Sequence, residues 1–147
     1  MAEPMNGPPL EGEWGALLGE PTRLVSSLER GEVPDLPGVY LWWRDGEVVY
    51  VGMATSLRTR LWGKHLGAGT SLASSSLRRN VCELLFGIPP GLTSNPKRQK
   101  VTRSQADEIR LWLASCDLSW QACDSAEEAR FLEGRLRAEH LPMLNRT

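Results

Sequence analysis

The sequence is poor in the residues that usually build metal-binding and redox sites. It contains three cysteines and two histidines among 147 residues. The cysteines, at positions 82, 116 and 123, form no CxxC pair and their number is odd. We therefore expect reduced, inert thiols and no disulfide framework. A zinc site of the usual Cys/His kind is not expected either.

Long apolar runs and export signals are also absent. No run approaches the ~20 residues needed to cross a bilayer. The acidic N-terminal stretch MAEPMNGPPLEGEWG lacks a basic region leading into an apolar core. These absences predict a cytoplasmic protein with no membrane partner. The sequence shows no Gly-rich phosphate loop of the Rossmann or P-loop type and no Ser/His/Asp pattern, which disfavours an enzyme of small-molecule metabolism.

Positive charge is concentrated in one segment, although the net charge is only −1. The stretch from Ala54 to Arg103 holds nine basic residues and a single acid, Glu83. Such a segment suits a face that binds a polyanion, and a merely solvated surface is the alternative. The residues expected to contact phosphates are Arg58, Arg78, Arg79, Lys97, Arg98, Lys100 and Arg103.

The stretch Pro37 to Arg60 reads as a β-hairpin followed by a helix. Residues 39–43 and 48–51 are rich in β-branched and aromatic residues, and Asp45-Gly46 between them is a strong turn signal. A two-residue turn pairs Tyr40 with Val51 and puts Tyr40 and Tyr50 on opposite faces. A three-residue loop pairs the two tyrosines directly, on one face. We predict the second register; ordinary strand aromatics are the plainer reading.

The remaining elements follow from capping and apolar spacing. We predict a disordered segment over 1–12, an N-terminal helical extension over 13–35 that acts in packing, and a main domain over 36–147 with a basic insertion at about 67–103. Within the main domain, helices are expected from about 55 to 66, from about 76 into the 80s, from 104 to 115 and from 125 to Pro142, with a third strand at 118–122. These elements predict an α/β (α+β) domain with a three-stranded antiparallel sheet flanked by helices.

Two half-motifs of the hairpin resemble a known family. Gly38-Val39-Tyr40 and Tyr50-Val51-Gly52 look like the two halves of the GIY-YIG motif. Arg60 lies ten residues after the second tyrosine, as in that nuclease superfamily. Glu133 matches the family's metal-binding glutamate, and Asn145 matches the asparagine of its Pro-x-x-Asn ending. The chain thus resembles a small stand-alone GIY-YIG protein.

The resemblance implies a divalent-metal-dependent endonuclease acting on DNA, with Mg²⁺ or Mn²⁺ as cofactor. It implies that Tyr40 is the general base or its relay and that Tyr50 positions the water or the phosphate. Arg60 would clamp the scissile phosphate, Glu133 would hold the metal, and Asn145 would orient the ligands or fix the C-terminus. RNA remains an alternative substrate, and a homodimer or protein partner is a possible source of specificity.

The position four residues after Arg60 departs from the family, which often has histidine or tyrosine there. Lys64 occupies it, and His65 lies one residue further, about 140° round an ideal helix from Arg60. Gly63 can distort the helix enough to bring His65 back, so either residue is a candidate for the site. The competing functional class is a catalytically silent nucleic-acid-binding module with the same fold.

Overall fold

The computed structural model describes residues 7–95 and 99–145. In chain order its elements are α1 (Gly12–Leu18), β1 (Arg23–Leu24), the 3₁₀ turns η1 (Val25–Ser27) and η2 (Arg30–Glu32), β2 (Gly38–Arg44), β3 (Glu47–Ala54), the π-helix η3 (Thr59–His65), α2 (Ser76–Phe86), α3 (Pro90–Thr93), α4 (Arg103–Ala114), β4 (Asp117–Ala122) and α5 (Ala126–Glu139). Among these described residues no helix is both long and apolar enough to cross a membrane.

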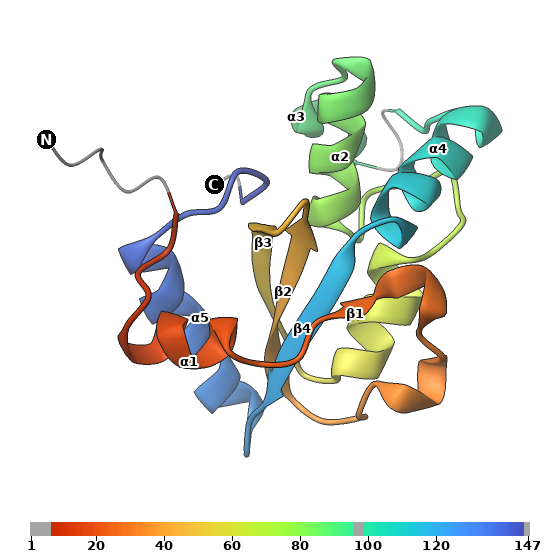
Figure 1. Ribbon diagram of the computed structural model, residues 1–147. Coiled ribbons are helices and arrows are strands. Elements are labelled where there is room, and N and C mark those ends of the chain that lie inside the picture. The colour runs from red at the N-terminus through yellow and green to blue at the C-terminus, as the bar shows by residue number, and fades with distance from the viewer. Residues whose placement is uncertain (1–6, 96–98, 146–147) are drawn as a thin grey trace, which may run out of the picture.

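The strands form one antiparallel sheet with helices on both faces (Figure 1). Its order is β1-β4-β2-β3, so β3 is an edge strand. The prediction of three strands missed β1, which pairs Arg23 with Leu118 and Leu24 with Asp117. The sheet is therefore four-stranded. The missed strand is only two residues long and carries no alternating pattern, since both of its side chains are exposed.

The hairpin of β2 and β3 closes in a register that differs from the predicted one. Arg44 pairs with Glu47 across the two-residue turn Asp45-Gly46, whose φ angles of 52° and 79° are those of a type I′ turn. A bulge between Trp42 and Trp43 then shifts the pairing by one residue. Tyr40 consequently faces Gly52, and Tyr50 faces Trp42. The two tyrosines share a face, as predicted, but lie diagonally across the hairpin.

Each face of the sheet has its own core. The face that carries Tyr40, Trp42 and Tyr50 packs against η3, α2 and α4 through Leu57, Leu61, Leu77, Val81, Ile109 and Leu113. The opposite face, with Val39, Leu41 and Val51, packs against α1 and α5 through Trp14, Leu17, Ala129, Leu132 and Leu136. The helical spacing of Ala129, Leu132 and Leu136 predicts that they form the inner stripe of α5, and all three are buried. The same spacing predicts an inner stripe of Leu77, Val81, Leu84 and Leu85 in α2, which is confirmed at Leu77 and Val81 only, because Leu84 and Leu85 are 50% and 37% exposed.

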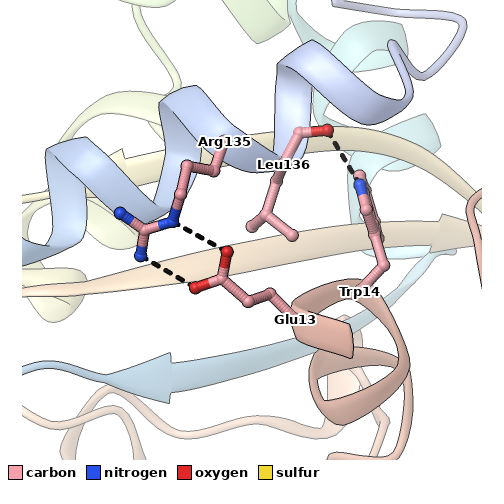
Figure 2. Close-up of polar contacts among 4 residues, drawn as sticks. All are labelled: Glu13, Trp14, Arg135 and Leu136. Atoms are coloured by element: carbon pink, nitrogen blue, oxygen red, sulfur yellow. Dashed lines mark hydrogen bonds and ion pairs between the residues drawn. The ribbon is translucent and has the colours of Figure 1, made fainter. Parts of the chain in front are cut away.

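The N-terminal helix α1 holds α5 in place through two side-chain contacts, referred to below as the clamp (Figure 2). Trp14 is fully buried and its indole Nε1 donates to the Leu136 carbonyl at 2.8 Å. One residue earlier on each helix, Arg135 forms a two-point ion pair with Glu13, each contact 2.8 Å long. Of the helical extension predicted over 13–35, only α1 is an α-helix: it ends at Leu18, and after Pro21 the chain continues as β1 and two 3₁₀ turns. The clamp positions α5, which carries Glu133.

Candidate active site

The phenol ring of Tyr40 lies across β3 because the opposite residue is glycine. A Cβ atom on Gly52 would overlap the Tyr40 ring and its hydroxyl. The ring therefore occupies the space that a side chain at position 52 would fill, and its hydroxyl is directed over the edge strand. This contact explains physically why the second half-motif ends in glycine.

A π-helix brings His65 to the same face. In η3 each hydrogen bond spans five residues instead of four, as in Leu66 N–H to Leu61 C=O at 2.9 Å. Residues five apart then lie one above the other, so His65 returns to the side of Arg60. The predicted distortion near Gly63 takes this form. His65 is buried, whereas Lys64 is exposed.

Two hydroxyl contacts connect this face to the start of α2. His65 Nε2 lies 2.5 Å from Tyr40 Oη, and His65 Nδ1 lies 2.6 Å from Ser75 Oγ. The hydroxyl of Tyr50 is 2.7 Å from Ser76 Oγ. The centroids of the Tyr40 and Tyr50 rings are 6.2 Å apart, and the imidazole ring lies within 6.0 Å of both. The three rings form one compact group, referred to below as the Tyr-His-Tyr group.

Glu133 approaches this group from the other side of the sheet. Helix α5 covers the opposite face, but Glu133 lies at its margin next to the edge strand and accepts a hydrogen bond from the Met53 backbone. Its charge acts on both tyrosines, and so does that of Arg60. The four predicted residues Tyr40, Tyr50, Arg60 and Glu133 therefore converge beside the edge strand β3.

Burial dominates the electrostatics of the site. It raises the pKa of Tyr40 well above its ordinary value of 10.0, the neighbouring Tyr50 adds to this, and Arg60 opposes it. Burial likewise raises the pKa of Tyr50, against its hydrogen bond with Ser76. Burial, followed by the charges of Arg60 and Arg78, lowers the pKa of His65 to about 3. All three rings are therefore neutral at neutral pH.

The carboxylate of Glu133 suits a hard cation. Burial raises its pKa, which Arg137, the Met53 backbone and Arg60 oppose. Within the described residues no ion pair satisfies this half-buried carboxylate, and no group of three or more His, Cys, Asp or Glu side chains surrounds a metal position. A single carboxylate with water in the other positions is the arrangement that Mg²⁺ accepts. The residues therefore fit the predicted ion.

Asn145 binds the backbone of the same edge strand, β3. Its side-chain amide both accepts from the Val51 N–H and donates to the Val51 carbonyl, at 2.7 Å each. Leu144 N–H donates to the Val49 carbonyl, and Asn80 donates to the Leu144 carbonyl. Of the two roles expected for Asn145, these contacts support the second, in which it fixes the C-terminal segment.

Most of the described arginines of the basic segment donate hydrogen bonds to backbone carbonyls. Arg78 is only 3% exposed and donates to the Gly69 and Ser71 carbonyls. Arg79 donates to Leu72 and Ala73, Arg103 to Ala68, and Arg58 to Val33. A direct phosphate contact by Arg78 does not fit its burial. Lys100 is exposed, and Lys97 and Arg98 lie outside the described residues.

A cavity of about 250 Å³ opens beside Arg60 and is lined by Thr55, Ser56, Thr59, Arg60 and Lys64. Its lining is made of hydroxyls and cations, which suits an anionic group such as a phosphate. Lys64, the alternative to His65 in the sequence, therefore lies on the outer side of Arg60 and away from the buried rings.

Three residues of the site were not predicted from the sequence. Ser75 and Ser76 were expected to open a helix, but nothing in the sequence connects them to the tyrosines. Arg137 follows Glu133 by one helical turn, and its charge acts on both Glu133 and Tyr50. Its spacing of four from Glu133 was the available signal.

Comparison with known protein families identifies a family that covers most of the chain. The family model described as the GIY-YIG catalytic domain matches residues 38–147. A search of curated proteins found no match. The matched range includes both strands of the hairpin, η3 and α5, which carry the residues that converge at the edge of β3. The chain therefore belongs to the GIY-YIG catalytic domain family, a family of nuclease type.

Proposed function

We propose that this protein is a divalent-metal-dependent endonuclease that hydrolyses DNA phosphodiester bonds and is directed to its target by DNA structure or by a partner. The observation that carries the proposal is the convergence of the Tyr-His-Tyr group with Arg60 and Glu133 beside the edge strand β3. Neutral proton-transfer groups, a cation and an acidic ligand are the components that phosphodiester hydrolysis needs.

In this proposal Tyr40 first releases its own proton to solvent and then, as the phenolate, takes the proton of the attacking water. Its raised pKa opposes that role until positive charge enters the site. A divalent ion held by Glu133 would supply such charge and would also stabilise the anionic phosphate. His65 holds the Tyr40 oxygen in place through their hydrogen bond. Tyr50, fixed by Ser76, would orient the water or the phosphate.

Arg60 would bind the scissile phosphate. Its side chain is half-buried, lines the cavity beside Lys64, and its charge reaches both tyrosines. The fixed fork of guanidinium donors suits phosphate oxygens. Lys64 and the hydroxyls of Thr55 and Thr59 would then contact the adjacent part of the strand.

The specificity of such an enzyme would come mainly from shape. Arg79 and Arg103 are partly used by loop carbonyls, so fewer cations than the sequence suggested remain for phosphates. Phosphate contacts carry little base information in any case. A partner or a second copy of the chain remains a proposed source of specificity, RNA an alternative substrate, and a cytoplasmic location a prediction.

The experiment that tests the proposal is cleavage of a labelled panel of linear, nicked, flapped, branched and single-stranded DNAs. Wild type is compared with Glu133→Ala, and Glu139→Ala, an exposed change on the same helix, is the matched control. Cutting that requires Mg²⁺ or Mn²⁺, persists in Glu139→Ala and is lost in Glu133→Ala is expected. DNA binding in EDTA with no cutting by any of the proteins would instead favour the silent binding module.

A further inference from the structure

Ser75 occupies the junction between the Tyr-His-Tyr group and helix α2. Its side chain is 1% exposed. The hydroxyl oxygen accepts the Arg78 backbone N–H at 3.1 Å, which caps the helix. The same oxygen lies 2.6 Å from Nδ1 of His65. One buried atom thus serves both the helix and the imidazole.

The hydrogen atoms at this junction can be counted. A serine hydroxyl has one hydrogen to donate and two lone pairs. The Arg78 N–H occupies one lone pair. If Nδ1 of His65 carried a hydrogen, Ser75 would accept twice and its own buried hydrogen would need an acceptor. Residues 7–95 and 99–145 show none. Buried hydroxyl groups are rarely left in that state.

The other arrangement satisfies every group. Ser75 donates its hydrogen to Nδ1, and a neutral His65 then carries its own hydrogen on Nε2. That hydrogen is directed at the Tyr40 oxygen, 2.5 Å away. The imidazole is neutral because its pKa is lowered to about 3 by burial and by Arg60 and Arg78. Tyr40 therefore accepts a hydrogen bond from His65 and donates its own hydrogen to Tyr50, a hydrogen bond that helps to raise the pKa of Tyr40 as donation by its hydroxyl would.

We infer that Ser75 is a positioning residue of the nuclease site: it fixes His65 in the Nε2–H tautomer, and His65 thereby donates a hydrogen bond to the Tyr40 oxygen. The inference rests on the proposed function for its consequence in catalysis. A donor aimed at the Tyr40 oxygen favours the ionised phenol over the neutral one. His65 then acts as a donor to the base, not as an acceptor of its proton.

The loop before Ser75 is built to hold it in place. Every backbone carbonyl from position 68 to 73 accepts a hydrogen bond, from Arg78, Arg79, Arg103 or the Val101 N–H. The next residue, Ser76, holds the Tyr50 hydroxyl. The loop over residues 68–73, held by these arginines, therefore positions two adjacent serines: Ser75 contacts His65, and Ser76 contacts Tyr50.

The tautomer can be measured in the free protein, without substrate or metal. The chain has two histidines, so ¹⁵N-labelled histidine gives two sets of imidazole signals, and His140→Gln assigns them. Long-range proton–nitrogen correlations report which ring nitrogen carries the hydrogen. Wild type is expected to show His65 as the Nε2–H tautomer alone. Ser75→Gly, which removes the hydroxyl but costs a helix cap only a few tenths of a kcal/mol, is expected to show a mixture.

Cleavage kinetics give the second readout. Ser75→Gly and Ser75→Ala are expected to lower kcat roughly 10-fold or more, with little change in KM. Ser75→Thr, which keeps the hydroxyl, is expected to recover most of the rate. Ser74→Ala changes the exposed neighbouring serine and is the matched control, expected to behave as wild type. Thermal melting of each variant separates a positioning effect from loss of the fold.

An Nδ1–H tautomer in wild type, or an unchanged tautomer in Ser75→Gly, would overturn the inference whether or not the protein cuts DNA. Wild-type kcat in a folded Ser75→Gly would overturn it as well. Failure of wild type to cut any substrate would count against the proposed function alone, since the tautomer is read in the free protein.

Discussion

The hydroxyl of Tyr40 and Nε2 of His65 lie 2.5 Å apart, although 25 residues separate them in the chain. Strand β2 supplies one partner and the π-helix η3 the other. The contact exists because η3 has a five-residue hydrogen-bond spacing, which turns His65 inward and leaves Lys64 outside. The two candidates that the sequence left open thus occupy different environments.

Replacing these two residues should therefore affect different kinetic constants. His65→Gln is expected to lower kcat roughly 10-fold or more, because it removes the imidazole contact with Tyr40 in a buried site. Lys64→Ala is expected to raise KM in a salt-dependent way and to change kcat little, since Lys64 is exposed beside the cavity at Arg60. Steady-state cleavage at two salt concentrations checks both. Equal losses of kcat in the two variants would contradict the assignment.

His65 should also make the fold sensitive to acid. Its pKa is about 3 in the folded protein and near 6.5 in the unfolded chain, so the unfolded state binds more protons between these values. Its contribution to the free energy of unfolding is fully present above pH 6.5 and is lost as the pH falls toward 3. Urea unfolding at several pH values should show this loss, and His65→Gln should weaken it.

His140 is the control for that measurement. Burial lowers its pKa in the same direction, and its ring contacts Trp14 rather than the site. His140→Gln should retain most of the wild-type loss of stability below pH 6.5. Glu133 acts in the opposite sense, because its raised pKa favours the folded state at low pH. A pH profile unchanged by His65→Gln would show that His65 is not the buried neutral group described above.

Gly52→Ala should damage both stability and activity. The added methyl group overlaps the Tyr40 ring, so the ring or the strand must move, at a cost of about 1–3 kcal/mol. Gly134→Ala, one residue after Glu133, is the matched control because nothing lies within 4 Å of its new Cβ. That change should stabilise α5 by about 0.5–1 kcal/mol. Chemical denaturation of both variants checks the contrast.

The two contacts between α1 and α5 should contribute differently to the free energy of unfolding. Trp14→Ala removes a fully buried indole and its hydrogen bond to Leu136, and it should cost about 3–5 kcal/mol. Arg135→Ala breaks an ion pair with Glu13 in which the two side chains are 56% and 41% exposed, and it should cost far less than Trp14→Ala because solvent screens an exposed pair. Comparable losses in the two variants would contradict the view that the indole provides the clamp.

Local sequence patterns predicted the elements better than their register. The apolar strands and Asp45-Gly46 located the hairpin, and Ser125 with the stripe at 129, 132 and 136 located α5. The bulge, in which Val49 is the unpaired residue of β3, was missed because the Val49 carbonyl is bound by the N–H of Leu144, a residue distant in the sequence. Since one residue of register moves every side chain to the other face, this distant contact decides where Tyr50 points.

The sequence predicted the site residues that belong to the family motif. It did not predict the residues that reach the site only through contacts between distant parts of the chain. Ser75 and Ser76 resemble ordinary capping residues in the sequence; their contacts with His65 and Tyr50 depend on how α2 packs. The basic segment was predicted to be a polyanion-binding face, with a solvated surface as the alternative, and both readings place its side chains outside. Arg78, Arg79 and Arg103 instead donate to backbone carbonyls of the loop at 68–73, and the sequence gives no sign that these carbonyls need donors.

The most direct test of the account is the single-turnover rate of Tyr40→Phe beside Glu133→Gln on the DNA that wild type cuts best. Phe keeps the ring over Gly52 and removes only the hydroxyl, and Gln keeps the shape of Glu133 and removes its charge. The account predicts that both variants fold and bind DNA and that both lose cleavage by roughly 100-fold or more. Near-wild-type cleavage by Tyr40→Phe would contradict the catalytic role of this edge of the sheet.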